Sequence, residues 1–198
     1  MQIARRTLII AATGLLLASA GVIAADRNAA LAQQLTGNWK LEPSASDDPQ
    51  AKLVEAIATR KKPRRPRREP AIDEVFIPDE PVDPRRETEI WQNELATPPQ
   101  LSINASGSDI RIGANERDLR SFSPGQPYAR VDTRGTAKIS SSWKSGSFEV
   151  RERYQRYDRG GSRTETYALD KTGRLVFTRV VQMPMFGSIT IRSVYSRI

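Results

Sequence analysis

Three charged side chains share one face of the predicted strands with apolar neighbours: Glu152, Glu165 and Arg179. Burying an unpaired charge is costly, so we expect these groups to pair, to lie at a rim, or to contact a ligand. Small-molecule sites usually combine apolar walls with a few polar groups. The sequence therefore predicts a ligand-binding site in which Glu165 and Arg179 are the polar anchors. The candidate ligand-binding residues are Tyr154, Glu165, Tyr167, Phe177 and Arg179. A rim position, or a bulge that resets the alternation, is the other explanation.

Groups suited to catalysis are few, because the chain has no histidine and no cysteine. The segments Ser141-Ser142-Trp143-Lys144 and Lys171-Thr172-Gly173 match two motifs of penicillin-recognising serine enzymes. However, Ser108-Asp109, which mimics the middle motif, precedes the first one, and Ser141 lies on a predicted strand. Glu152 and Glu165 could form a glycosidase-like carboxylate pair, but only their shared face supports it. We expect a non-enzymatic protein with no catalytic residue, no cofactor and no metal site, since zinc ligands and EF-hand spacing are absent.

The N-terminus has the pattern of a secretory signal. Arg5 and Arg6 precede a run of small and apolar residues from Leu8 to Ala25, and Ala30-Leu31-Ala32 offers a cleavage site. We expect residues 1–32 to be a signal peptide and residues 33–198 a single domain in the bacterial periplasm. Cleavage after Ala24, or an uncleaved membrane anchor, is the alternative.

Seven positive charges fall within nine residues of a proline-rich segment, residues 60–84, which we expect to form an extended arm inserted in the domain. The cluster could bind anionic lipid or lipopolysaccharide. Six acids follow directly, so the arm could instead neutralise itself. Nucleic acid is not an expected partner of an exported protein. The candidate surface-binding residues are Arg60, Lys61, Lys62, Arg64, Arg65, Arg67 and Arg68.

Two short helices are predicted around this arm, after a first strand at residues 35–41. One begins with Asp48 as N-cap and Pro49 at the first helical position, and it carries Leu53 on its apolar side. The other begins at Asp83-Pro84 and ends before Pro98-Pro99.

From residue 100 onward, apolar residues recur at every second position between turn signals such as Lys144-Ser145-Gly146 and Asp170-Lys171-Thr172-Gly173. This pattern predicts a mostly β fold, an antiparallel up-and-down meander that forms a sandwich or a barrel. Alternating charges on the longest strand argue against an outer-membrane barrel.

The Gly37-Asn38-Trp39 segment on the first strand, followed by a helix and a meander, resembles the opening of lipocalin-like barrels. The resemblance implies a barrel of eight to ten strands, in which Gly37, Trp39 and Arg197 close the base and Arg197 stacks over Trp39. The chain is also similar to small exported bacterial proteins that share Ser46-Asp47-Asp48-Pro49 after the tryptophan strand. It departs from the barrel family in its helical and proline-rich insert.

Two functions follow from these patterns. The first is an exported barrel that binds or carries a hydrophobic or amphipathic small molecule in the cell envelope, as the resemblance implies. The second is an envelope protein whose basic arm binds an anionic surface or a protein partner, for example through Val75-Phe76-Ile77.

Overall fold

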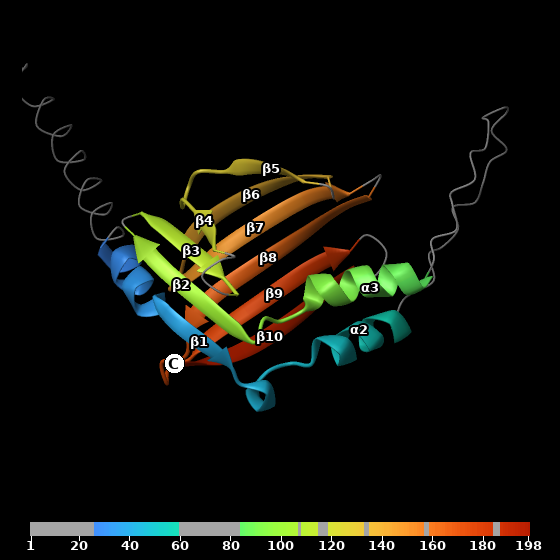
Figure 1. The fold of residues 1–198 in the computed structure, drawn as a ribbon, viewed down its shortest axis with the longest axis horizontal. Helices are drawn as coiled ribbons and strands as arrows, with labels where there is room; N and C mark the ends of the chain where they lie inside the picture. The colour runs from blue at the N-terminus through green and yellow to red at the C-terminus, as the bar shows by residue number, and fades with distance from the viewer. Residues whose placement is uncertain are drawn as a thin grey trace, which may run out of the picture.

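The computed structural model describes residues 26–59, 84–106, 108–114, 119–132, 135–156, 159–183 and 187–198. In this part of the chain, ten antiparallel strands form one curled sheet, a half-barrel, with short helices at its two ends (Figure 1). The predicted mostly β, up-and-down meander is confirmed. The basic arm and the apolar N-terminal run lie outside the described residues.

The sheet follows the chain order closely. From one edge to the other the strands run β4-β3-β2-β1-β10-β9-β8-β7-β6-β5, so the first strand pairs with the last, and β4 and β5 are the two edges of the described sheet. The bounds are β1 Gly37–Leu41, β2 Gln100–Ser106, β3 Asp109–Gly113, β4 Arg120–Phe122, β5 Tyr128–Asp132, β6 Gly135–Lys144, β7 Ser147–Arg156, β8 Arg159–Leu169, β9 Leu175–Met183 and β10 Gly187–Arg197.

Helices lie at opposite ends of the curled sheet (Figure 1). At one end, helices α2 (Pro49–Ala58) and α3 (Pro84–Leu95) pack on each other and on β10 and β9. At the other end, residues 26–35 form an N-terminal helix. A 3-10 turn, η1 (Pro43–Ala45), follows β1.

Both predicted helices are confirmed. Asp48 caps α2, because its Oδ1 accepts hydrogen bonds from the amides of Gln50 and Ala51 at 2.8 and 3.3 Å. Helix α3 begins at Pro84, as its sequence predicted, and ends at Leu95. Among the described residues, no helix has the length and apolar character needed to cross a bilayer.

The interior holds two apolar clusters. The main core lies against the sheet and the N-terminal helix, and it contains a row of rings that crosses β6 to β10, with neighbouring centroids 5.0–6.5 Å apart. A second cluster, the helix-covered core, lies beneath α2 and α3. The ring row consists of Trp143, Phe148, Tyr167, Phe177 and Tyr195; the helix-covered core consists of Leu53, Leu95, Val181, Ile189 and Ile191.

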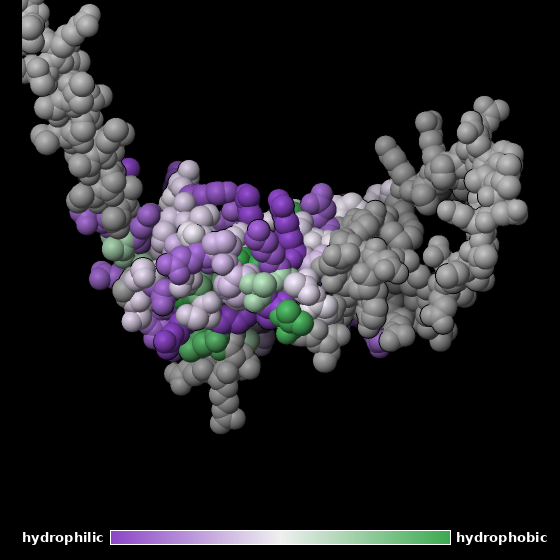
Figure 2. Space-filling model, turned by 90° about the horizontal axis from the view of Figure 1, so that it is seen from above, coloured by the Kyte–Doolittle hydropathy of each residue, from purple (hydrophilic) through white to green (hydrophobic). Residues whose placement is uncertain are grey.

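The outer face of the sheet is mainly polar, as strict alternation requires. Seen from above, the surface of the described residues is largely hydrophilic, with small hydrophobic patches (Figure 2). Val194 departs from the alternation, because it is fully buried and so are both of its neighbours, Ser193 and Tyr195. Its carbonyl accepts a hydrogen bond from the Glu42 amide at 2.8 Å, and its amide donates to Ser46 Oγ at 2.9 Å. The segment after β1 therefore covers the outside of β10 at this point.

Candidate functional site

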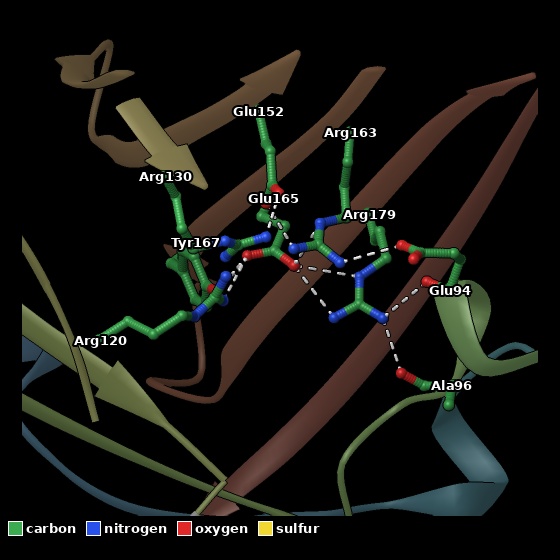
Figure 3. Close-up of polar contacts among 9 residues, drawn as sticks. All are labelled: Glu94, Ala96, Arg120, Arg130, Glu152, Arg163, Glu165, Tyr167 and Arg179. Carbon is green, nitrogen blue, oxygen red and sulfur yellow. Dashed lines mark hydrogen bonds and ion pairs between the residues drawn. The ribbon is translucent and has the colours of Figure 1, made fainter. Parts of the chain in front are cut away.

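An ion pair between two neighbouring strands lies at the centre of the interior. Glu165 on β8 stands opposite Arg179 on β9, and their side chains are only 2% and 10% exposed. Arg179 Nε and Nη2 both lie near Glu165 Oε1, at 3.2 and 3.0 Å. The two predicted polar anchors therefore contact each other (Figure 3).

The remaining nitrogen of the Arg179 guanidinium, Nη1, contacts the end of α3. It donates to the carbonyl oxygens of Glu94 and Ala96, at 3.1 and 2.7 Å. The last carbonyls of a helix have no partner within the helix, so this arginine satisfies groups that would otherwise need water. Arg179 thus links the end of α3 to strand β9.

Arg163 links all three carboxylates of this region. Its Nη2 lies 2.6 Å from Glu152 Oε2, its Nη1 lies 3.2 Å from Glu94 Oε2, and its Nε lies 3.4 Å from Glu165 Oε1. Glu152 is on β7 and Glu94 is on α3, so one guanidinium connects two strands and a helix.

Two further arginines reach the network from the edge strands. Arg120 on β4 places Nη2 3.1 Å from Glu165 Oε2, and Arg130 on β5 places Nη2 2.6 Å from Glu152 Oε1. Their side chains are 33% and 38% exposed, whereas the glutamates they contact are buried. The two edge strands therefore each supply a partly exposed arginine that contacts a buried glutamate. We call the seven side chains of this group the charged network: Glu94, Arg120, Arg130, Glu152, Arg163, Glu165 and Arg179 (Figure 3).

The arginines determine the protonation of Glu165. Burial opposes ionisation of this carboxyl group, but the positive charges of Arg179, Arg163 and Arg120 outweigh it and lower its pKa to about 2. Tyr167 donates a hydrogen bond to Glu165 Oε2 at 3.1 Å; burial and the adjacent carboxylate raise its pKa well above the usual value. At neutral pH, Glu165 is therefore an anion and Tyr167 a neutral donor.

The ionisation of these groups limits the chemistry that they can carry out. Glu165 is held as a carboxylate, so it has no proton to donate near neutral pH. No group of three or more potential metal ligands occurs in the part of the chain that the structure describes. What the interior does offer is guanidinium groups, which bind planar anions with two parallel hydrogen bonds.

The structure brings together four of the five residues predicted to bind a ligand. Tyr167 and Phe177 are fully buried in the ring row, and their centroids lie 5.0 Å apart. Glu165 lies within hydrogen-bonding distance of Tyr167 and forms the ion pair with Arg179. Tyr154 is half-buried and lies farther along β7, beside Gly161, where a Cβ would approach its ring to 2.6 Å. Whether these residues bind a ligand stays a prediction.

Four members of the charged network were not expected from the sequence. Arg163 shares the strand face of Glu165, two residues away, and this spacing is a signal that could have identified it. Arg120 and Arg130 belong to short edge strands without apolar alternation, and Glu94 belongs to a helix, so no periodicity marked them.

At the opposite end of the sheet, the side chain of Arg197 lies over the Trp39 ring, 4.5 Å from its centroid. Arg197 also donates to the carbonyls of Thr36 and Gln34, at 2.8 and 2.6 Å, and a Cβ on Gly37 would lie 2.9 Å from its Nη1. The expected contact between Arg197 and Trp39 is present. Its role in closing a barrel stays a prediction.

Comparison with known proteins gives structural likenesses only. No protein-family model and no curated protein matches the chain. Two similar solved structures are the fluorescent protein UnaG, as a point mutant (16% identity, 84% of this chain, 97% of the other, TM-score 0.47) and as wild type (16%, 82%, 96%, 0.46). A third is a secretary abundant heat soluble (SAHS) protein from Ramazzottius varieornatus (10%, 83%, 96%, 0.48). These likenesses assign neither a family nor a function to the chain.

Proposed function

We propose that this protein is an exported, non-enzymatic binding protein that carries a hydrophobic or amphipathic small molecule in the cell envelope. The observation that supports this proposal is the charged network inside an otherwise apolar half-barrel. Buried ion pairs contribute little to stability compared with apolar side chains of similar volume. A network of this size therefore favours recognition of a polar group over simple packing.

The surroundings of the charged network fit an amphipathic ligand. Arg179 lies over the Phe177 ring of the ring row, 5.1 Å from its centroid, and it also contacts the end of α3, whose Leu95 belongs to the helix-covered core. Arg120 and Arg130 connect the network to solvent from the two edges of the described sheet. An apolar molecule could pack on the rings while its polar end meets the arginines.

The test is ligand binding by the purified, exported protein. Native mass spectrometry should reveal a co-purifying lipid, and 11-(dansylamino)undecanoic acid should bind with a fluorescence increase. Arg120→Gln should weaken probe binding about tenfold, since a hydrogen bond to a charged group contributes about 1.5–3 kcal/mol. Arg151→Gln, the same change on an exposed side chain of β7, should leave binding unchanged. A protein with no co-purifying lipid and no probe binding would contradict the proposal.

The proposal that the protein is exported depends on the N-terminal sequence alone. Cell fractionation of a tagged chain should recover the protein in the periplasm of a bacterial host, and Arg5→Glu/Arg6→Glu should retain it with the membrane or cytoplasm. Recovery of both forms in the cytoplasm would contradict export.

A second proposal concerns the arm, whose seven positive charges could bind anionic lipid or lipopolysaccharide. It is supported by the charge run and by the place of the arm between α2 and α3. These two helices cover one end of the half-barrel, so an arm bound to a membrane would bring that end close to the lipid surface.

A further inference from the structure

The end of α3 contributes three oxygen atoms to two arginines, Arg179, which is buried, and Arg163, which is 16% exposed. The Glu94 carboxylate lies against Arg163 Nη1, and the carbonyls of Glu94 and Ala96 accept from Arg179 Nη1. The three acceptors come from two residues, Glu94 in the last turn of the helix and Ala96 directly after it. Figure 3 shows this segment facing the two guanidinium groups, while Glu165 lies on their other side.

Glu94 is an unfavourable residue for its own helix. It is the last residue but one of α3, where the helix dipole is negative and a cation is preferred. Its side chain is only 14% exposed, and its neighbour Leu95 is fully buried in the helix-covered core. The contact with Arg163 offsets this unfavourable position in the helix.

The charge around Arg163 and Arg179 would be poorly balanced without Glu94. Arg120, Arg163 and Arg179 all converge on the single carboxylate of Glu165. Glu152 is shared between Arg163 and Arg130. The sheet thus supplies more guanidinium groups than carboxylates at this place, and α3 supplies the additional anion.

We propose that Arg163, beside Arg179, forms a binding site for one anionic group, and that the Glu94 carboxylate is a tethered occupant which the anionic end of a ligand displaces. This inference rests on the proposed function and specifies its ligand as an amphipathic molecule with a single carboxylate or sulfonate. The incoming anion takes the place of the Glu94 carboxylate on Arg163. The end of α3 then loses the contact between Glu94 and Arg163 and keeps the two hydrogen bonds from Arg179, so that ligand entry weakens the attachment of α3.

A tethered competitor lowers the apparent affinity for anionic ligands only. The experiment therefore compares 11-(dansylamino)undecanoic acid with its uncharged methyl ester on the full mature chain. Glu94→Gln should strengthen binding of the acid at least fivefold and leave binding of the ester unchanged. Glu89→Gln, an exposed glutamate of the same helix, should change neither. Adding Arg163→Gln to Glu94→Gln should weaken binding of the acid again, and circular dichroism should show that each variant is folded.

The outcomes separate this inference from the proposed function. If Glu94→Gln left both affinities unchanged, or raised both equally, α3 would act as a cover without charge competition and the inference would be wrong, while the carrier function would stand. If wild-type protein bound neither probe but Glu94→Gln bound the acid, the inference would hold. If no variant bound either probe, both would be wrong.

Discussion

Glu165 is the residue on which three arginines converge, and its ionisation should therefore control stability at low pH. Because its pKa in the folded protein is lowered to about 2, the folded state favours the carboxylate more than the unfolded state does. The stabilisation is complete above the unfolded pKa of about 4.5 and is lost as the pH falls from there towards 2. We expect a loss on the order of 3 kcal/mol, measured as a shift of the urea midpoint between pH 6 and pH 2.5.

Glu165→Gln serves as the matched variant, because it keeps the shape of the side chain and removes its charge. It should be less stable than the wild type at pH 6 and should lose less stability on acidification. Equal acid sensitivity in both proteins would show that other carboxylates dominate the acid transition.

Arg197 should be sensitive to replacement by lysine. Its guanidinium lies over Trp39 and donates to two carbonyls at the end of the N-terminal helix, and a lysine ammonium cannot maintain this planar arrangement. We expect Arg197→Lys to lower the unfolding free energy by about 1 kcal/mol, or the melting temperature by roughly 3 °C. Tryptophan fluorescence during thermal unfolding measures this. Arg192→Lys, on the exposed face of the same strand, is the control, and equal shifts in both variants would contradict a specific role of Arg197.

Some residues of the charged network and of the Arg197–Trp39 contact could be predicted from the sequence, and others could not. Glu165 and Arg179 were identifiable because a charge in an apolar strand face is costly, whatever it contacts. Trp39 and Arg197 were identifiable through a resemblance. The contact of Glu94 with Arg163 depends on how a helix end docks on a sheet, and no local pattern encodes that.

At the scale of elements, the N-terminal helix has a consequence for where the mature chain begins. Ala32 and Leu35 are buried in the main core, and Thr36 donates its amide and its hydroxyl to the Ala32 carbonyl, at 3.1 and 2.9 Å. Cleavage after Ala32 would remove most of this helix, whereas cleavage after Ala24 would keep all of residues 26–35.

We therefore predict that the exported protein starts upstream of Asp26, as determined by N-terminal sequencing or intact mass. A chain that starts at Ala25 should melt several degrees above one that starts at Gln33, because it keeps Ala32, which is buried in the main core, and Leu31, which packs against that core, a contribution of roughly 2 kcal/mol. A mature N-terminus at Gln33, with equal melting temperatures of the two chains, would contradict this prediction.

The elements themselves differ in how far local sequence determines them. The turn before β9 was identifiable from the sequence because aspartate and glycine favour turns. In the structure, Asp170 Oδ1 accepts hydrogen bonds from the amides of Thr172 and Arg174, at 2.8 and 3.0 Å, and Gly173 has a φ of +79°. Helix α2 was identifiable from its cap. Strands β4 and β5 are short edge strands, and their pairing depends on β3 and β6 rather than on their own residues.

At the scale of the whole molecule, the proposed membrane contact can be tested by deleting the arm. Replacing residues 60–83 by a short glycine-serine linker should abolish binding to phosphatidylglycerol vesicles at low salt, because the positive charges provide the attraction. Vesicle co-sedimentation at 20 and 300 mM salt measures this, with phosphatidylcholine vesicles as the control. Binding that survives the deletion would exclude the arm as the membrane contact.

The pairing of β1 with β10 also affects how the chain acquires its structure during synthesis. Trp39 stands opposite Arg197, so two neighbouring strands inside the sheet come from positions about 150 residues apart in the chain. Contacts this distant are slow to form, since a long loop must close before they are made. In the described sheet, the pairs from β5 to β10 and from β2 to β4 join strands that follow one another in the chain, so only the pairs made by β1 wait for distant segments. The two parts of the sheet, β4 to β1 and β10 to β5, can therefore be joined only after β10 has been translated.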